Sequence, residues 1–185
     1  MAARASILQS YKEASLAERL DIICKNYPIF LGIVDSSTDG LIYVIENEKA
    51  YNKRFSNGDT GVRVQKSRST DTTADTAINN VMTRDALIAC DFSGGVLDGT
   101  DRAEEFKQEA FTLQKMRADY DLFNSQLKIL KPQERQLFVG FISREMDYGM
   151  IADEIGSGLD YAVLKIHRAK MKIKGKMIDY LEGKL

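Results

Sequence analysis

A row of basic side chains near the end of the sequence has the composition of a phosphate-binding surface. Between positions 161 and 176 the chain carries six basic residues and no acidic residue. Lys165, Arg168 and Lys172 follow one another at helical intervals, so on a helix they would project from neighbouring turns of one side. Such groups hold phosphates in nucleic-acid complexes, but an ordinary solvated helix face has the same pattern. The surrounding elements must decide between these two interpretations.

Two short amphipathic helices are predicted immediately before this row. Pro132 suits the first helical position, because the amide that proline lacks would have no partner there. Asp147 is expected to cap the second helix, which then ends at Gly156-Ser157-Gly158. The predicted inner faces are Leu137, Phe138, Phe141 and Ile142 in the first helix, and Tyr148, Ile151, Ala152 and Ile155 in the second.

The basic row itself belongs to a third, longer predicted helix. Its apolar stripe lies on a different side from the basic row and consists of Ala162, Ile166, Ala169, Ile173, Met177 and Tyr180. A short helix, a tight glycine turn and a longer helix form the helix-turn-helix arrangement. That context favours a DNA-binding interpretation of the basic row over a merely solvated face.

The residues of these helices also carry a family resemblance. Leu130 to Arg135, the Ile151-Ala152 pair, Gly156 and His167-Arg168-Ala169 resemble the fourth conserved, promoter-reading region of bacterial sigma factors. The chain departs from that pattern at Ser157-Gly158, where the family has an apolar residue and then Ser or Thr. It also departs where the family has polar base readers, because the matching positions here are Leu159, Asp160, Val163 and Leu164.

The resemblance implies a transcription regulator that binds double-stranded DNA and contacts RNA polymerase. The DNA-binding residues it implies are Leu159, Asp160, Tyr161, Leu164, Lys165, His167, Arg168 and Lys172. Lys165, Arg168 and Lys172 would hold phosphates, which position a protein on DNA without reading its sequence. Specificity would come from Asp160, Tyr161, Leu164 and His167, or from DNA shape. A complete sigma factor is not expected, because the upstream part lacks an aromatic and basic melting helix.

A protein-binding adaptor is the alternative function. In that interpretation the apolar Leu159, Val163 and Leu164 dock on RNA polymerase or another regulator without direct DNA readout. Leu159 and Val163 could also simply cover the turn between the helices.

A second resemblance lies upstream, at residues 63–80. The phrase RVQKSRSTDTTADTAINN, together with the sigma-like end, is similar to small phage-encoded regulators of the ArpU and RinA type. By physical reasoning alone the phrase is an ordinary polar loop, with Ser69 or Asp71 as a helix cap. The resemblance implies a phage-encoded or horizontally transferred gene, and a cytoplasmic protein at the nucleoid of a bacterial host.

The remaining segments predict an all-α protein with an N-terminal helical region, 1–127, and a helix-turn-helix module, 128–185. Residues 6–31 are expected to be one helix broken at Pro28, unless Ser15 and Glu18 form a capping box and start a new one. Residues 39–56 favour helix over strand, and 56–76 favour a polar loop. The helix predicted over 74–92 would bury Ala77, Ile78, Val81, Leu87 and Ile88.

A long helix is predicted over 101–127. Its nearly heptad stripe requires a partner and consists of Phe106, Ala110, Leu113, Met116, Tyr120, Phe123, Leu127 and Leu130. The partner is either the rest of the chain, which we favour, or a second copy in a homodimer.

Composition argues against several other classes. With 185 residues, 44% of them hydrophobic and 29% charged, the chain can form a core and does not have a disordered composition. No long apolar run predicts a membrane span or a signal peptide. No metal-ligand cluster, phosphate loop or G-x-S-x-G elbow occurs, so neither a cofactor nor an enzymatic activity is expected. Cys24 and Cys90 are expected to be reduced and structural.

Overall fold

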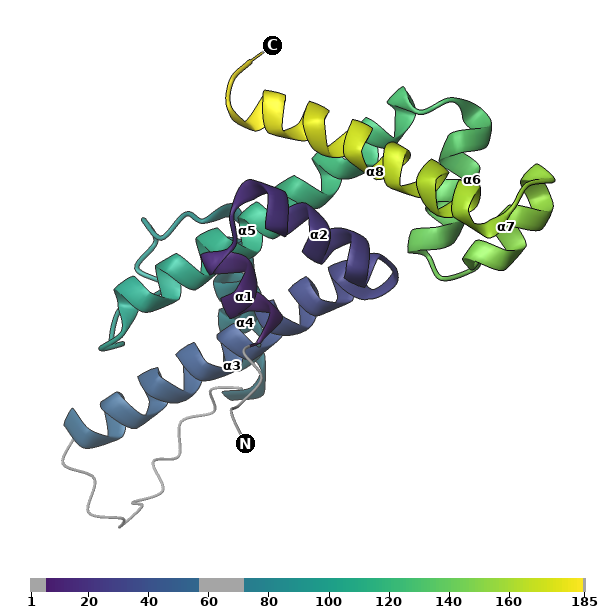
Figure 1. Ribbon diagram of the computed structural model, residues 1–185. Coiled ribbons are helices and arrows are strands. Elements are labelled where there is room, and N and C mark those ends of the chain that lie inside the picture. Colours follow the sequence, from purple (N-terminus) through teal and green to yellow (C-terminus); the bar gives the residue numbers. More distant parts are fainter. Residues whose placement is uncertain (1–5, 57–71, 185) are drawn as a thin grey trace, which may run out of the picture. The chain divides into compact units, whose positions relative to one another are not determined.

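The computed structural model describes residues 6–56 and 72–184, and these residues form helices and connecting turns without a strand. The predicted all-α class is therefore confirmed for the described residues. Figure 1 shows the helices, whose bounds are α1 Ile7–Glu13, α2 Leu16–Asn26, α3 Phe30–Ser56, α4 Thr72–Ala89, α5 Ala103–Gln126, α6 Pro132–Ile142, α7 Tyr148–Ile155 and α8 Leu159–Leu181. Two 3₁₀ turns, η1 Tyr27–Ile29 and η2 Leu127–Ile129, precede α3 and α6.

The chain divides into two compact units. The terminal unit comprises Met1–Ile33 and Met116–Leu185, and the middle unit comprises Val34–Lys115. The predicted boundary at 127/128 does not separate these units, because α1 and α2 belong to the same unit as α6, α7 and α8. The predicted caps Ser69 and Asp71, and the first half of the phrase at 63–80, lie outside the described residues.

The N-terminal helices of the terminal unit begin at serine caps. The Ser6 side chain accepts a hydrogen bond from the Gln9 amide at 3.1 Å. Ser15 and Glu18 form the capping box, since Glu18 accepts from the Ser15 amide at 2.8 Å and Ser15 caps α2 in return. A new helix therefore starts at Leu16, as the capping-box alternative predicted, and Pro28 lies in the 3₁₀ turn between α2 and α3.

An aromatic cluster joins the start of α3 to α5 and α6 within the terminal unit. Phe30 stacks on Tyr120 with ring centroids 5.5 Å apart, and Phe123 lies 6.5 Å from Phe138. The Tyr11 hydroxyl donates to the buried Asp119 carboxylate at 2.7 Å. Burial, together with this hydrogen bond and the negative charge of Asp119, raises the pKa of Tyr11 above its usual range. Tyr11 is therefore a neutral donor that satisfies a buried carboxylate.

Local signals set the ends of α6, α7 and α8 where the sequence predicted. Pro132 opens α6, and the Asp147 side chain caps α7 by accepting from the Met150 amide at 2.9 Å. Gly156 ends α7 in the left-handed conformation, with φ 62°, so the chain can turn sharply into α8. The α7–turn–α8 succession is thus fixed by a side-chain cap and a glycine.

The inner faces of these three helices are largely those predicted. Leu137, Phe138, Ile142, Ile151 and Ala152 are buried, and so are all predicted stripe residues of α8 except the last. Tyr180 is 46% exposed, so that assignment was wrong. A periodic pattern continues to the end of a helix whether or not packing neighbours do, which is why it could not identify this position.

The middle unit packs α3 and α4 around residues such as Val34, Leu41 and Ile45. The prediction of helix for 39–56 is confirmed, because this segment belongs to α3. Glu48 of α3 fixes the turn before α5 by accepting from the Asp101 amide at 2.7 Å and pairing with Arg102 at 2.9 Å.

The buried face predicted for α4 was mostly wrong. Ile78 and Val81 are each 57% exposed, and Ala77 and Ile88 are exposed too. Among residues 77–89, the part of α4 whose side chains are described, the buried positions are Thr83, Ala86 and Leu87. This helix carries apolar residues on more than one side, so its periodicity does not determine which side faces the core.

The stripe of α5 is buried or half-buried within the single chain. Phe106, Ala110 and Leu113 are buried in the middle unit, and Met116, Phe123 and Leu127 in the terminal unit. Each part of the stripe is covered without a second copy, which agrees with the favoured intramolecular alternative. A homodimer through this helix, the second alternative from the sequence, stays a prediction.

One helical stretch of the described residues, Leu16–Phe55, is long and apolar enough to cross a membrane by length and composition, with a mean hydropathy of 1.3 over its most apolar part. The core helix of a soluble protein passes the same test, so this is a weak indication. The prediction that no segment spans a membrane stays a prediction.

Candidate nucleic-acid interface

The predicted DNA-binding residues lie on the part of α8 that its neighbours do not cover. Leu159, Asp160, Tyr161, Leu164, His167, Arg168 and Lys172 are exposed, and Lys165 is half-buried. The buried stripe of Ala162, Ile166, Ala169 and Ile173 holds the opposite side of the helix against the rest of the terminal unit. The predicted residues therefore share one solvent-facing surface.

This surface has a central strip and two flanks, because successive helical residues are about 100° apart. Asp160 and Leu164 lie on the central strip, directly opposite the buried stripe. One flank, called here the α6-side flank, consists of Tyr161, Lys165, Arg168 and Lys172. These side chains line a hollow of about 140 Å³ together with Glu134 of α6.

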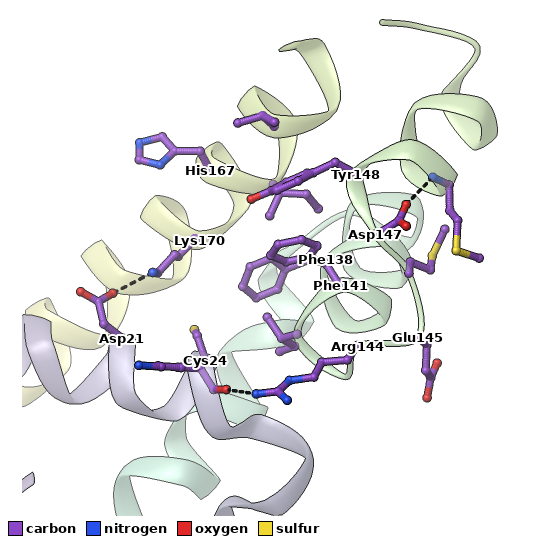
Figure 2. A pocket seen from close by; sticks show the side chains of 16 residues that line it. Asp21, Cys24, Phe138, Phe141, Arg144, Glu145, Asp147, Tyr148, His167 and Lys170 are labelled. Carbon is purple, nitrogen blue, oxygen red and sulfur yellow. Dashed lines mark hydrogen bonds and ion pairs between the residues drawn. The ribbon is translucent and has the colours of Figure 1, made fainter. Parts of the chain in front are cut away.

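The other flank, Val163, His167 and Lys170, lines a larger cavity of about 680 Å³ with α2 and the turn between α6 and α7. Figure 2 shows Phe138 and Phe141 at its centre and Lys170 reaching Asp21 of α2. The structure therefore separates His167 from the basic row that the sequence placed beside it.

Asp21 of α2 neutralises two of the six basic residues. Its carboxylate lies 2.8 Å from the ammonium of Lys170 and 3.2 Å from that of Lys174. Burial acts to raise the pKa of Asp21, but the two ammonium groups more than offset it, so the pKa lies below its ordinary value. These two lysines therefore serve as internal partners of Asp21, which the charge count along the sequence could not show.

The α6-side flank keeps more of its charge available. Lys172 is 3.9 Å from the Glu134 carboxylate, a contact between partly exposed groups. Lys165 and Arg168 have no ion pair with any described residue. Within the predicted phosphate row, two cations are thus unpaired and the third is weakly paired.

The larger cavity is held together by structural contacts. The Tyr148 ring packs on Phe141 with centroids 4.5 Å apart. The Arg144 guanidinium donates to the Lys25 carbonyl at 3.1 Å, satisfying the carboxyl end of α2. Burial raises the pKa of the Cys24 thiol to about 11, so this thiol is neutral at physiological pH and poorly nucleophilic.

Apolar side chains are also exposed on this side of the unit. Leu159 is 58% exposed, and Val163 and Leu164 are 44% and 40% exposed. They are not simple covers of the turn, since much of each side chain faces solvent. Met150 of α7 and Met171 of α8 are exposed as well. The sequence did not single them out, because a methionine on a helix is not by itself a signal of exposure.

No family model, no curated protein and no solved structure matches this chain.

Proposed function

We propose that the protein is a sigma-like, DNA-binding regulator of transcription. In this proposal α7 and α8 act as a helix-turn-helix, and α8 enters the major groove of double-stranded DNA. The observation that carries the proposal is that Lys165 and Arg168, on the exposed side of α8, have no ion pair with a described residue, while Lys170 and Lys174 are held by Asp21. On such a helix the paired lysines stabilise the fold, and the cations on the exposed side can bind the phosphates of a nucleic acid.

The roles of the side chains follow from their positions around α8. Lys165, Arg168 and Lys172 on the α6-side flank contact phosphates. Asp160 and Leu164 on the central strip, with His167 beside them, face the base edges. The apolar Leu164 can contact a thymine methyl group, and Asp160 can accept from a cytosine amine.

The sequence resemblances support the same proposal. In this proposal the chain regulates a few genes through a promoter-reading module. Its own gene is phage-encoded or horizontally transferred, and the protein acts in the cytoplasm of a bacterial host. RNA polymerase is then a second partner beside DNA.

A salt titration of DNA binding tests the proposal. Wild type, Lys165→Ala and Arg168→Ala are titrated with a native promoter fragment and with random duplex. Each variant should bind both duplexes more weakly and lower the salt slope by about 0.9. The matched control is Lys170→Ala, which removes the same charge from the same helix but from a lysine paired with Asp21. If Lys165→Ala and Arg168→Ala keep the wild-type affinity and slope, the DNA-binding proposal is wrong.

A protein-binding adaptor is the second candidate, because Leu159, Val163 and Leu164 are exposed apolar side chains. In this function they dock on RNA polymerase without direct DNA readout. Crosslinking in the native host, followed by purification of the protein, separates the two functions. An adaptor brings polymerase alone, and Leu159→Ser with Leu164→Ser abolishes its capture. A DNA-binding regulator brings promoter DNA, which Lys165→Ala with Arg168→Ala abolishes.

A further inference from the structure

The hollow between α6 and α8 has the composition of a site for a single anion. Its lining combines three cations, Lys165, Arg168 and Lys172, with the Tyr161 side chain and one carboxylate, Glu134. Its volume of about 140 Å³ is too small for a drug-sized molecule but leaves room for a phosphate group.

Glu134 is the residue that does not fit an anion site. Its carboxylate lies 3.9 Å from the Lys172 ammonium and accepts from the Lys131 amide at 3.3 Å. The second contact joins the Glu134 carboxylate to the backbone amide of the N-cap residue of α6, so Glu134 has a structural role that holds it at the edge of the hollow. A negative charge in that position competes with any incoming anion for Lys172 and also repels it.

Tyr161 has a different environment from that of a base reader. It lines the hollow with the three cations, one turn before Lys165, and not the central strip with Asp160 and Leu164. A phenol hydroxyl beside cations is a hydrogen-bond donor to an anion. The location of Tyr161 thus places it with the cations that would bind phosphates, whereas the sequence analysis grouped it with the residues that would read the bases.

We infer that this hollow is the seat of one DNA backbone phosphate, bound by Lys165, Arg168, Lys172 and the Tyr161 hydroxyl, and that Glu134 limits its affinity. The inference rests on the proposed DNA-binding function and adds two residues to it. The Glu134 carboxylate competes with the DNA phosphate for Lys172, and this keeps sequence-independent DNA binding weak. Since phosphates carry no sequence information, both residues act equally on specific and random DNA.

The test uses substitutions that act in opposite directions. Glu134→Gln removes the charge but keeps an acceptor for the Lys131 amide, since Gln also serves at the third position of a helix. It should raise affinity for a promoter fragment and for random duplex alike, by about two- to fivefold at low salt. Tyr161→Phe removes only the hydroxyl and should weaken binding to both duplexes by a similar factor, without changing the ratio between them. A gain of affinity in Glu134→Gln cannot result from partial unfolding.

The matched control is Glu145→Gln, the same change at an exposed carboxylate that lines the other cavity. It should leave affinity nearly at the wild-type value, because a distant surface charge is screened. If Glu134→Gln gains no more than Glu145→Gln while wild type still binds DNA with a steep salt dependence, only the phosphate seat is wrong. A Tyr161→Phe variant that changes the promoter-to-random ratio and spares random duplex also overturns it. If wild type binds no DNA, the proposed function and the seat are wrong together.

Discussion

Asp21 shows how one carboxylate decides the role of a basic helix. It pairs with Lys170 and Lys174, so these two cations are less available to bind an external polyanion such as DNA. Lys165 and Arg168, without such a partner among the described residues, stay available. At the scale of single residues, α8 therefore has an inner basic side that serves folding and an outer basic side suited to binding.

The stabilisation that the Asp21 ion pairs contribute should depend on pH, and substituting Asp21 should show that dependence. The pKa of Asp21 lies below its ordinary value of 3.8, so its ion pairs stabilise the folded protein above that pH and are lost as the pH falls through the lower pKa. We expect Asp21→Asn to reduce the free energy of unfolding by about 0.5–1 kcal/mol at neutral pH, as for partly exposed pairs. Urea unfolding at neutral and acid pH measures it.

The difference between wild type and Asp21→Asn should vanish at the most acid pH. Asp153→Asn is the control, since this exposed carboxylate of α7 has no ion pair with a described residue. A deficit of the same size at every pH would mean that the substitution acts through packing and not through charge.

At the scale of the helices, the left-handed residue after α4 stores strain that can be removed. Cys90 follows the last residue of α4 with φ 52°, where a side chain costs about 1–2 kcal/mol relative to right-handed backbone. We expect Cys90→Gly to stabilise the protein by about 0.5–1 kcal/mol, because glycine adopts this conformation without strain but loses more chain entropy. The urea midpoint reports the change.

Cys90→Ala separates backbone strain from the loss of the thiol. Alanine keeps the strained conformation, so this variant should not share the gain of Cys90→Gly. Equal stabilisation by both would show that removal of the thiol is responsible.

The packing of α7 on α8 gives another test at this scale. Ile151 is fully buried, whereas Ile155 is only half-buried. Ile151→Ala should cost about 2–5 kcal/mol, in the range for a buried aliphatic truncation, and Ile155→Ala should cost less. Thermal or urea unfolding ranks the two variants. A negligible cost at both positions would be inconsistent with the α7 contacts described here.

For the whole molecule, the covered stripe of α5 bears on the oligomeric state. Phe106 and Phe123 lie in different units, and both are buried within the single chain. Phe123→Ala should therefore cost about 3–5 kcal/mol in unfolding and leave the sedimentation coefficient of the folded protein unchanged. If the protein sediments as a dimer that this substitution converts to folded monomers, the stripe is an intermolecular contact.

The sequence by itself determined the features that are encoded within a few turns of chain. Asp147, Gly156, Pro132 and the Ser15–Glu18 box mark helix ends because each acts on backbone groups three or four residues away. The stripes of α5 and α8 were readable because one side of each helix is consistently apolar. The exposed surface of α8 followed from the same periodicity, so the candidate site could be placed from sequence.

Only the tertiary structure decided which groups meet across long stretches of chain. Asp21 and Lys174 form their contact 153 positions apart. Helical spacing places Lys174 and Lys165 on different sides of α8, but it does not show which side meets a carboxylate of another helix. In α4, with apolar residues on more than one side, the neighbouring helices select the buried face that contains Leu87. The assignment of Tyr161 to a hollow with Glu134 likewise depends on where α6 packs. Local propensity fixes where helices begin and end, but the pairing of charges and the choice between faces depend on contacts that exist only after the helices have packed.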